Sequence, residues 1–552
     1  MNRTKKELCQ SKSVKLDYNG LTCTRFAHTG GVQSLIPRSN LLVASNFHVP
    51  IDRDSEEPIY RQLIRYVRAQ VDSGMLPAGT RLPASRDLAR QLNISRISVV
   101  NAYAELRAEG YLSAHAGRGT FVAGEKGEML TAASTLPSAG SPPSTNGASH
   151  GHHHDQNNSS DRSLRDLMKL ARKPGVINFS HGVPPSEFFP VFHLRDAINT
   201  VLERDGTRAL GYEQPEGYAP LRATVRDYVS ALGIQCTLDQ VLITGGTQQA
   251  LDLIVQAILG EGDLLLTENP TYLGMLDIAR TRRVQVMGIP MDEDGIRLDM
   301  LENVILESHP RLLYVMPTFQ NPTGRIMPIH RRRQLLNLAS EYGVTILEDS
   351  VYHEFRYEGE SLPPIKALDE EGIVIHTSGF TKNLLPGMRV GYVIANSSHY
   401  ERLVRVKQSA DISTPGLNQR AIHLMLERGV LAKQLERNNR ELKRRREVAL
   451  EYAARYLPSG SRWSTPVGGL YLWIELPKHG PTASELYVAA IQQGVAYGIG
   501  NVFHTDNGGS YNIRINFAAQ KPSDIEEGLK RLGKAWRETA YDYADMEKSP
   551  LL

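Results

Sequence analysis

Cysteine is scarce in this sequence, and two kinds of hydrophobic segment are missing from it. The 552 residues include three cysteines, Cys9, Cys23 and Cys236. Their odd number and wide spacing fit neither a disulfide framework nor a zinc site, so we expect free thiols. No apolar run reaches the roughly 20 residues that a membrane-spanning helix needs. The basic N-terminus lacks the apolar core of a secretory signal, so we expect no membrane contact and a cytoplasmic location.

Arginine, by contrast, is concentrated in one part of the chain. The whole chain has a net charge of only +3, yet residues 58–124 contain nine arginines, no lysine and four acidic residues, a charge of +5. A small basic module inside a nearly neutral chain favours a polyanionic partner.

The same basic segment has the pattern of a helix-turn-helix. In "PIYRQLIRYVRAQVDSG" apolar residues recur every four positions from Ile59 to Val71, which predicts an amphipathic helix. Two further helices are expected where Ser85 caps "RDLARQLN" and Ser95 caps "RISVVNAYAELRAEG". The run "YLSAHAGRGTFVA" predicts a hairpin that would form a wing.

Two segments lack the pattern of a folded domain. Residues 125–163 are dominated by Ser, Pro, Gly, Asn, Thr and His, so we expect a flexible linker with a reach of roughly 35 Å. Its cluster His152, His153 and His154 could bind a metal, but a solvated linker is the better interpretation of such a tract, and we expect no metal site. Residues 1–46 show no sustained periodicity and predict a flexible extension, or a start codon placed too far upstream.

After Asn178, segments typical of strands and helices alternate over the remaining chain, as in "VLITGG" followed by "TQQALDLIVQAIL". This alternation predicts an α/β fold whose mainly parallel sheet is covered on both faces. Ligands of such sheets bind at the carboxyl ends of the strands. The residues at those ends are therefore candidates for a site.

Several strand ends carry residues whose groups could bind or react with a ligand. Gly246 and Thr247 lead into a helix, whose free N–H groups favour a phosphate. Asp349 ends a hydrophobic strand, where an aspartate is costly unless a cation or a proton pairs with it. Lys382 supplies an amine, and Arg389 follows seven residues later. An amine for a Schiff base, an acid for a ring nitrogen and donors for a phosphate together describe a site for pyridoxal 5'-phosphate.

From about Asn178 to Leu532 the sequence resembles fold-type I aminotransferases. The motifs that carry the resemblance are "LGYEQPEGYAPLR", "TGGTQQALDL", "ENPTYLG", "QNPTG", "EDSVY", "SGFTKNLLPGMRVGY" and "YNIRINFA". The resemblance implies a pyridoxal phosphate-binding domain of the class I/II aminotransferase type at residues 164–540. It also implies a head-to-tail homodimer.

The resemblance further implies which residues would hold the cofactor's ring. Lys382 would form the Schiff base, and Asp349 would pair with the pyridinium nitrogen. Asn321 and Tyr352 would hydrogen-bond the phenolic oxygen, and Tyr272 would stack on the ring.

The remaining implied roles concern the phosphate and a carboxylate. The phosphate ligands would be Gly246, Thr247, Ser378 and Arg389. Tyr212 would reach the phosphate in the neighbouring subunit, and Arg514 would bind the carboxylate of a substrate or effector. The sequence departs from the family at one position, since the family usually has Ser or Thr three residues before the lysine and this chain has Gly379 there.

Residues 58–122 resemble the GntR-type winged helix-turn-helix, through "PIYRQL", "GTRLPASRDLARQLNISRISVVNAYAELRAEGYL" and "GRGTFV". The resemblance implies a domain at residues 47–124 that binds double-stranded DNA. The implied DNA contacts are Arg86, Arg96, Ser98, Gly117 and Arg118, of which the last two would form the wing tip. His115 stands where relatives often have an arginine.

A GntR-type head joined by a linker to an aminotransferase-like body is the arrangement of the MocR subfamily of regulators. It implies a transcription factor that binds paired half-sites as a dimer and senses an amine, an amino acid or the cofactor itself. The alternative is an active aminotransferase with an appended DNA-binding domain. A cofactor-free dimerisation platform is a third possibility, which the intact Lys382 and Asp349 disfavour.

Overall fold

The computed structural model of this protein describes residues 49–123 and 171–548. Short gaps within these ranges fall at residues 53–54, 56, 74, 78, 93, 109, 116–118, 172–173, 181, 183, 185 and 507. The chain divides into two compact units, residues 1–159 and 160–552. The predicted extension (1–46) and the predicted linker (125–163) lie outside the described residues. In the described part of the chain, no helix has both the length and the apolar character that crossing a bilayer requires.

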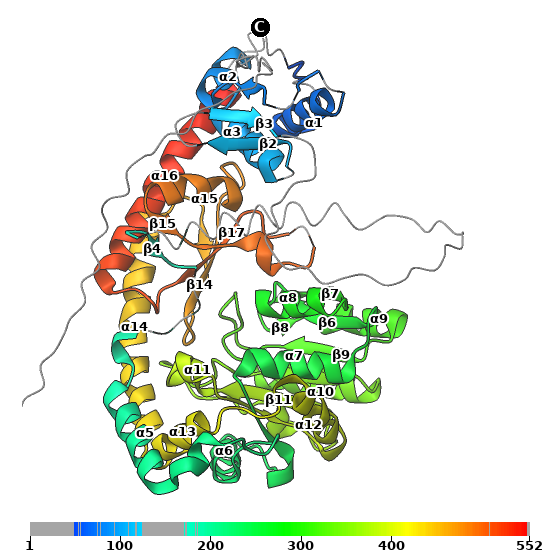
Figure 1. Ribbon diagram of the computed structural model, residues 1–552, viewed down its shortest axis with the longest axis vertical. Helices are drawn as coiled ribbons and strands as arrows, with labels where there is room; N and C mark the ends of the chain where they lie inside the picture. The colour runs from blue at the N-terminus through cyan, green and yellow to red at the C-terminus, as the bar shows by residue number, and fades with distance from the viewer. Residues whose placement is uncertain are drawn as a thin grey trace, which may run out of the picture. The chain divides into compact units, whose positions relative to one another are not determined.

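In its described residues, the first unit combines helices with a small antiparallel sheet of strand order β1-β3-β2 (Figure 1). Its elements are α1 (Ile59–Asp72), β1 (Arg81–Leu82), α2 (Ser85–Leu92), α3 (Arg96–Ala108), β2 (Leu112–His115) and β3 (Gly119–Val122). The predicted helix-turn-helix followed by a wing hairpin is therefore confirmed.

The core of the first unit follows from the predicted apolar stripe of α1. Leu63 and Val67 are fully buried in the middle of the stripe. At the start of α3, the Ser95 hydroxyl oxygen accepts a hydrogen bond from the Ser98 N–H at 3.4 Å, as expected of a helix cap. Ser85 differs slightly from the prediction, because it is the first residue of α2 rather than the residue before it.

The second unit is built around an eight-stranded sheet of order β5-β12-β11-β10-β9-β6-β7-β8 (Figure 1). Its strands are β5 (Val241–Thr244), β6 (Leu264–Asn269), β7 (Gln285–Asp292), β8 (Gly295–Ile296), β9 (Leu312–Val315), β10 (Thr345–Asp349), β11 (Val374–Gly379) and β12 (Gly391–Ile394). The strands from β11 to β7 are parallel, whereas β12 and β8 run antiparallel to their neighbours. The prediction of a mainly parallel sheet is confirmed.

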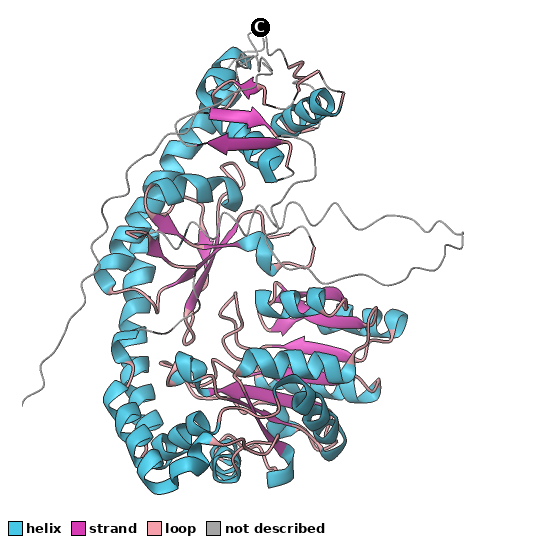
Figure 2. Ribbon diagram, in the orientation of Figure 1, coloured by secondary structure: helices cyan, strands magenta, loops and turns pink. Residues whose placement is uncertain are grey.

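Helices cover both faces of this sheet, as Figure 2 shows. The helices of this part of the chain are α5 (Val191–Asp205), α6 (Ala219–Ser230), α7 (Thr247–Ile258), α8 (Leu273–Thr281), α9 (Leu298–Ser308), α10 (Ile329–Glu341), α11 (Phe380–Asn383), α12 (Ser397–Asp411) and α13 (Gly416–Glu427). Short 3-10 helices are η2 (Ser186–Phe188), η3 (Gly206–Leu210), η4 (Leu238–Gln240), η5 (Ile365–Leu368) and η6 (Pro386–Met388).

Alternate residues of the central strands enter different hydrophobic cores. In β10, Leu347 packs in the core that contains Leu251 of α7, whereas Ile346 packs in the core that contains Leu335 of α10. Because both faces are covered, the strands are continuous apolar runs rather than alternating ones. The polar residues at the carboxyl ends of these strands are therefore exceptions that need a reason.

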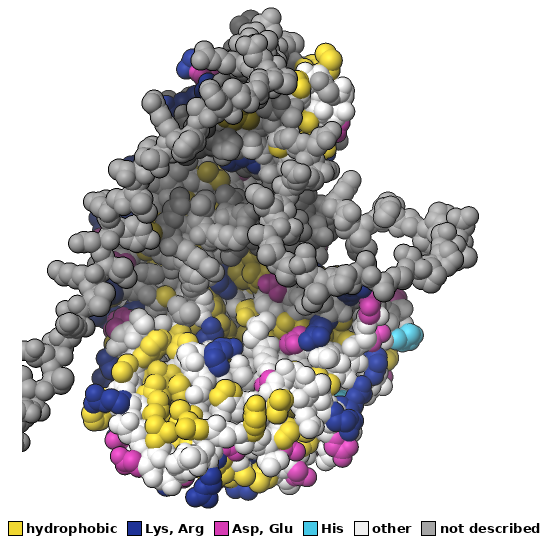
Figure 3. Space-filling view, in the orientation of Figure 1, with side chains coloured by type: hydrophobic (Ala, Val, Ile, Leu, Met, Phe, Trp, Pro, Cys, Tyr) yellow, Lys and Arg dark blue, Asp and Glu magenta, His cyan; other side chains and the backbone are white. Residues whose placement is uncertain are grey.

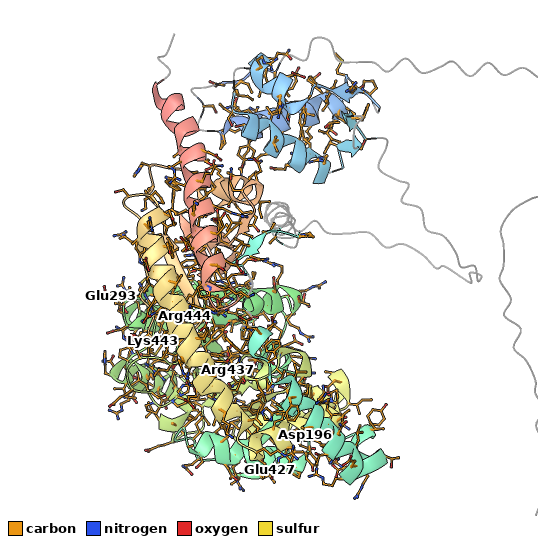
Figure 4. The ribbon with its side chains drawn as sticks, turned by 90° about the vertical axis from the view of Figure 1, so that its left-hand side faces the viewer. Asp196, Glu293, Glu427, Arg437, Lys443 and Arg444 are labelled. Carbon is orange, nitrogen blue, oxygen red and sulfur yellow. The ribbon has the colours of Figure 1, made fainter. Side chains whose placement is uncertain are left out.

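A second, antiparallel sheet of order β13-β14-β17-β16 follows toward the C-terminus. Its region contains α14 (Val430–Tyr456), β13 (Arg462–Trp463), β14 (Tyr471–Glu475), α15 (Ala483–Gln492), β16 (Gly498–Ile499), η7 (Gly500–Phe503), β17 (Asn512–Asn516) and α16 (Pro522–Lys548). A separate parallel pair joins β15 (Val495–Ala496) to β4 (Ile177–Asn178). The long helices α14 and α16 lie side by side, and Arg437, Lys443 and Arg444 project from α14 (Figure 4).

Candidate functional site

A pocket of about 100 Å³ lies at the carboxyl ends of the central strands. Seven of the predicted site residues line it: Thr247, Tyr272, Asn321, Asp349, Tyr352, Lys382 and Arg389. These residues come from positions spread over more than 140 residues of sequence, so the fold alone brings them together. A larger hollow of about 370 Å³ lies near Asp292 and Arg331, but these two side chains already form an ion pair with each other.

Lys382 lies in the short helix α11, directly after β11, and presents its amine to the pocket. The Nζ donates a hydrogen bond to the carbonyl oxygen of Gly182. Desolvation, together with the positive charges of Arg514 and Arg389, lowers the pKa of Lys382 to about 8, while Asp349 opposes the shift. A large fraction of this amine is therefore neutral near pH 8, which is the form that attacks a carbonyl.

Asp349 ends β10 and is 2% exposed. Its carboxylate accepts hydrogen bonds from the Tyr314 hydroxyl at 3.0 Å and from the Val351 N–H at 3.2 Å. Burial raises the pKa of Asp349 to about 6 despite these donors. A buried carboxylate of this kind gains most from a cationic or protonated partner within the pocket.

The groups beside the start of α7 form a cradle for an anion. Gly246 has φ of 92°, a left-handed conformation, and an added Cβ would lie 2.8 Å from an Nη of Arg389. The hydroxyls of Thr247 and Thr381 are buried and have no hydrogen-bond partner. Because buried hydroxyls are normally satisfied, and because helix N-termini attract anions, this cradle fits a phosphate group.

Arg514 on β17 lies between groups of the same site. It donates to Asn321 Oδ1 at 2.7 Å and to the carbonyl oxygen of Ser180 at 2.6 Å. Its Cζ also lies 4.4 Å from the centre of the Tyr471 ring and 4.7 Å from that of Phe503. The guanidinium is thus held in place by two aromatic rings and two hydrogen-bond acceptors.

Three of the predicted cofactor residues, Gly246, Ser378 and Tyr212, are not among those lining the pocket. The Ser378 hydroxyl donates to the carbonyl oxygen of Ser350 at 3.3 Å, within the sheet. Tyr212 is 85% exposed at the end of η3. Its predicted role requires a second subunit, so a single chain does not test it.

The sequence motifs assigned no role in the site to three residues that belong to this neighbourhood. Thr381 and Gln248 line the pocket, and Gln248 accepts a hydrogen bond from the Tyr272 hydroxyl at 3.0 Å. Their positions next to Lys382 and Thr247 were the available signal. Tyr471 contacts both Tyr352 and Arg514, but it is 119 residues from Tyr352 along the chain, and no local pattern connects the two.

The predicted DNA contacts lie in the first unit. Arg86 is exposed on α2, Arg96 begins α3, and Ser98 follows in the first turn of that helix. Gly117 and Arg118 lie outside the described residues. The histidine cluster of the linker also lies outside them, and the described residues contain no group of His, Cys, Asp or Glu side chains that could hold a metal.

The sequence and the fold have counterparts in known proteins. The family profile "Aminotransferase class I and II" matches residues 174–532, and "Bacterial regulatory proteins, gntR family" matches residues 59–122. The crystal structure of LysN, an alpha-aminoadipate aminotransferase from Thermus thermophilus complexed with N-(5'-phosphopyridoxyl)-L-leucine, matches with a TM-score of 0.64 and 36% identity over 68% of this chain and 94% of that one. The second unit is therefore an aminotransferase domain of class I and II.

Two relatives that match this chain over nearly its whole length are named as regulators. The HTH-type transcriptional regulator YdcR of Escherichia coli is 30% identical over 87% of this chain and 99% of its own length. The probable rhizopine catabolism regulatory protein MocR of Rhizobium meliloti is 28% identical over 88% of this chain and 95% of its own length. The chain therefore belongs to the MocR-type regulators of the GntR family, in which a GntR-type domain precedes a class I and II aminotransferase domain.

Proposed function

We propose that this protein is a DNA-binding transcription regulator whose aminotransferase-type unit binds pyridoxal phosphate and senses a small amine or amino acid. The observation that carries the proposal is the pocket. It combines a partly neutral lysine, a buried aspartate and two unpartnered hydroxyls, in a chain that also has a GntR-type unit. We further propose a head unit at 47–124, a linker at 125–163 and a body at 164–540.

The residues of the pocket fit the parts of the cofactor. The Lys382 amine would hold the aldehyde, and Asp349 would keep a proton on the ring nitrogen, which satisfies its buried charge. Asn321 and Tyr352 would bind the phenolic oxygen, and Tyr272 would stack on the ring. When bound, pyridoxal phosphate supplies an electron-withdrawing ring next to an amine.

The phosphate would occupy the cradle at the start of α7. Its ligands would be Gly246, Thr247, Ser378 and Arg389, as the resemblance implies. The unpartnered hydroxyl of Thr381 qualifies this residue as a further ligand. The Ser378 hydroxyl would have to turn away from the Ser350 carbonyl to reach the phosphate.

Sensing would begin at Arg514. An amino-acid effector would bring its carboxylate to this guanidinium and replace the Ser180 carbonyl as its acceptor. A ligand changes a conformational equilibrium only through contacts that differ between the two states. The exchange of the Ser180 carbonyl for a carboxylate is such a difference. Residues 174–180 would transmit this change toward the N-terminal end of the body.

A homodimer is part of this proposal. Val191, Phe192, Leu210 and Tyr212 are each more than 60% exposed, although all are apolar or aromatic. Figure 3 shows apolar side chains gathered where Figure 1 labels α5, α11 and α13. An exposed apolar cluster of this kind favours a protein interface, and it would place Tyr212 of one subunit near the phosphate cradle of the other.

An active aminotransferase is the second candidate. It is favoured by the 36% identity to LysN, an alpha-aminoadipate aminotransferase, and by the intact lysine and aspartate. Steady conversion of L-2-aminoadipate with an oxo-acid acceptor would support this candidate, and its absence in a protein that binds the cofactor would support the regulator.

The lowered pKa of Lys382 makes a prediction about the rate of cofactor binding. The amine reacts only when neutral, so the association rate of pyridoxal phosphate should rise with pH and level off above a midpoint near pH 8. An ordinary lysine would give a midpoint more than two pH units higher, since its pKa is 10.5. Stopped-flow absorbance at a series of pH values measures this midpoint.

A second prediction concerns the DNA-binding unit. Arg96→Ala should weaken operator binding by about 5- to 150-fold, because a lost contact at the recognition helix costs about 1–3 kcal/mol. Cofactor affinity should stay the same. Arg107→Ala, at the other end of α3, is the matched control and should bind DNA as the wild type does. Loss of cofactor binding in Arg96→Ala would mean that the two units do not act separately.

A further inference from the structure

Tyr471 occupies a central position in the site, although nothing in the sequence motifs points to it. It is the first residue of β14 and is 1% exposed. Its hydroxyl lies 2.8 Å from the hydroxyl of Tyr352, and the two rings meet edge to face with centres 5.6 Å apart. Tyr352 therefore cannot rotate without breaking a buried hydrogen bond.

The ring of Tyr471 supports a second group of the site. The guanidinium of Arg514 lies over this ring, with Cζ 4.4 Å from its centre. A cation over an aromatic face is attracted to it, most strongly where water is excluded. One side chain thus contacts both the proposed ligand of the phenolic oxygen and the proposed ligand of the carboxylate.

The Tyr471 hydroxyl also faces Gly182. A Cβ added to Gly182 would overlap this hydroxyl oxygen, while the next ring atom, Cζ, would be 3.6 Å away, which is an ordinary contact. The carbonyl oxygen of Gly182 accepts the hydrogen bond from Lys382. The hydroxyl at residue 471 therefore leaves no room for a side chain at residue 182. A ring without the hydroxyl would leave room for a Cβ there.

We propose that Tyr471 is a positioning residue of the ligand site, whose hydroxyl fixes Tyr352 and the segment at Gly182 and whose ring fixes Arg514. The inference rests on the proposed function, since it assigns Tyr471 to the same cofactor pocket. Tyr471 would act through its neighbours and would not itself react.

The test is a double-substitution cycle in the full-length protein, with the dissociation constant of pyridoxal phosphate as the readout. Tyr471→Phe should weaken binding about 3- to 10-fold, the effect of one lost buried hydrogen bond. Gly182→Ala should weaken it at least as much, because overpacking displaces Tyr471. The double variant should bind no more weakly than Tyr471→Phe alone, since the overlapping oxygen is gone.

Two controls and one further readout accompany the cycle. Tyr487→Phe removes a buried hydroxyl that has no partner, and Gly260→Ala adds a Cβ whose nearest neighbour lies at 3.7 Å. Both should bind the cofactor as the wild type does. The Lys382 amine faces the charges of Arg514, Arg389 and Asp349, and the Tyr471 ring lies against Arg514. Tyr471→Phe should therefore also shift the pH midpoint of the bound cofactor's visible absorbance.

The outcomes separate this inference from the proposed function. If the wild type binds no cofactor, both the proposed function and the inference about Tyr471 are contradicted. If the wild type binds and Tyr471→Phe matches it in affinity and pH midpoint, the inference alone is overturned. It is also overturned if Gly182→Ala weakens binding and Tyr471→Phe does not relieve the effect.

Discussion

We expect Lys382→Ala to abolish covalent attachment of pyridoxal phosphate. Lys382 is the lysine whose amine faces the pocket, and desolvation and neighbouring arginines keep a fraction of it neutral. After incubation with the cofactor and reduction with borohydride, peptide mass spectrometry should locate the adduct on Lys382 in the wild type. The variant should carry no adduct and should lack the visible absorbance of the bound cofactor.

A matched control separates this effect from the general effect of removing one lysine. Lys478 is an exposed lysine that does not line the pocket, and Lys478→Ala should retain the adduct in full. An adduct of equal yield in Lys382→Ala would contradict the assignment of Lys382 as the residue that binds the cofactor covalently.

The second expectation is that Asp349→Asn weakens cofactor binding and stabilises the cofactor-free protein. Breaking a buried charge pair costs about 3–5 kcal/mol, so the dissociation constant should rise at least about 100-fold. The amide can still serve the neighbours of Asp349, because its oxygen can accept from the Val351 N–H while its NH₂ donates to the Tyr314 hydroxyl.

The sign of the stability effect follows from the pKa of Asp349. Burial raises this pKa from 3.8 to about 6, so the ionised carboxylate destabilises the folded, cofactor-free protein above pH 6, and the effect disappears as the pH falls below 3.8. Asp349→Asn should therefore raise the free energy of unfolding by about 3 kcal/mol at neutral pH. Denaturant unfolding at neutral and acidic pH measures it. An equal increase in the free energy of unfolding at both pH values would contradict the buried charge of Asp349 as its origin. The same increase in Asp227→Asn would also contradict it, because Asp227 is exposed.

The sequence predicted the parts of the site that follow strand ends. Asp349 stands out because it ends an apolar strand, and Lys382 because it follows a run of small hydroxylated residues. A parallel sheet gathers such strand ends at one edge. The helices of the first unit were equally visible, since the first has an apolar residue every four positions and the next two follow Ser85 and Ser95.

Other features could not be predicted because they depend on contacts between distant segments. The antiparallel insertion of β12 between β11 and β5 is set by sheet pairing and leaves no local pattern. The place of Tyr471 under Arg514 depends on the register of β14 with β17, and that register is fixed by packing. The Ser378 hydroxyl lies against Ser350, which only the sheet geometry reveals.

A footprint of the purified protein on the intergenic DNA upstream of its own gene tests the link between the two units most directly. It should be recorded with and without pyridoxal phosphate, with the wild type beside Lys382→Ala. We expect protection of paired half-sites that changes when the cofactor is added to the wild type, and that does not change in Lys382→Ala. Protection that is identical in all four samples, or absent from all of them, would contradict a cofactor-linked regulator.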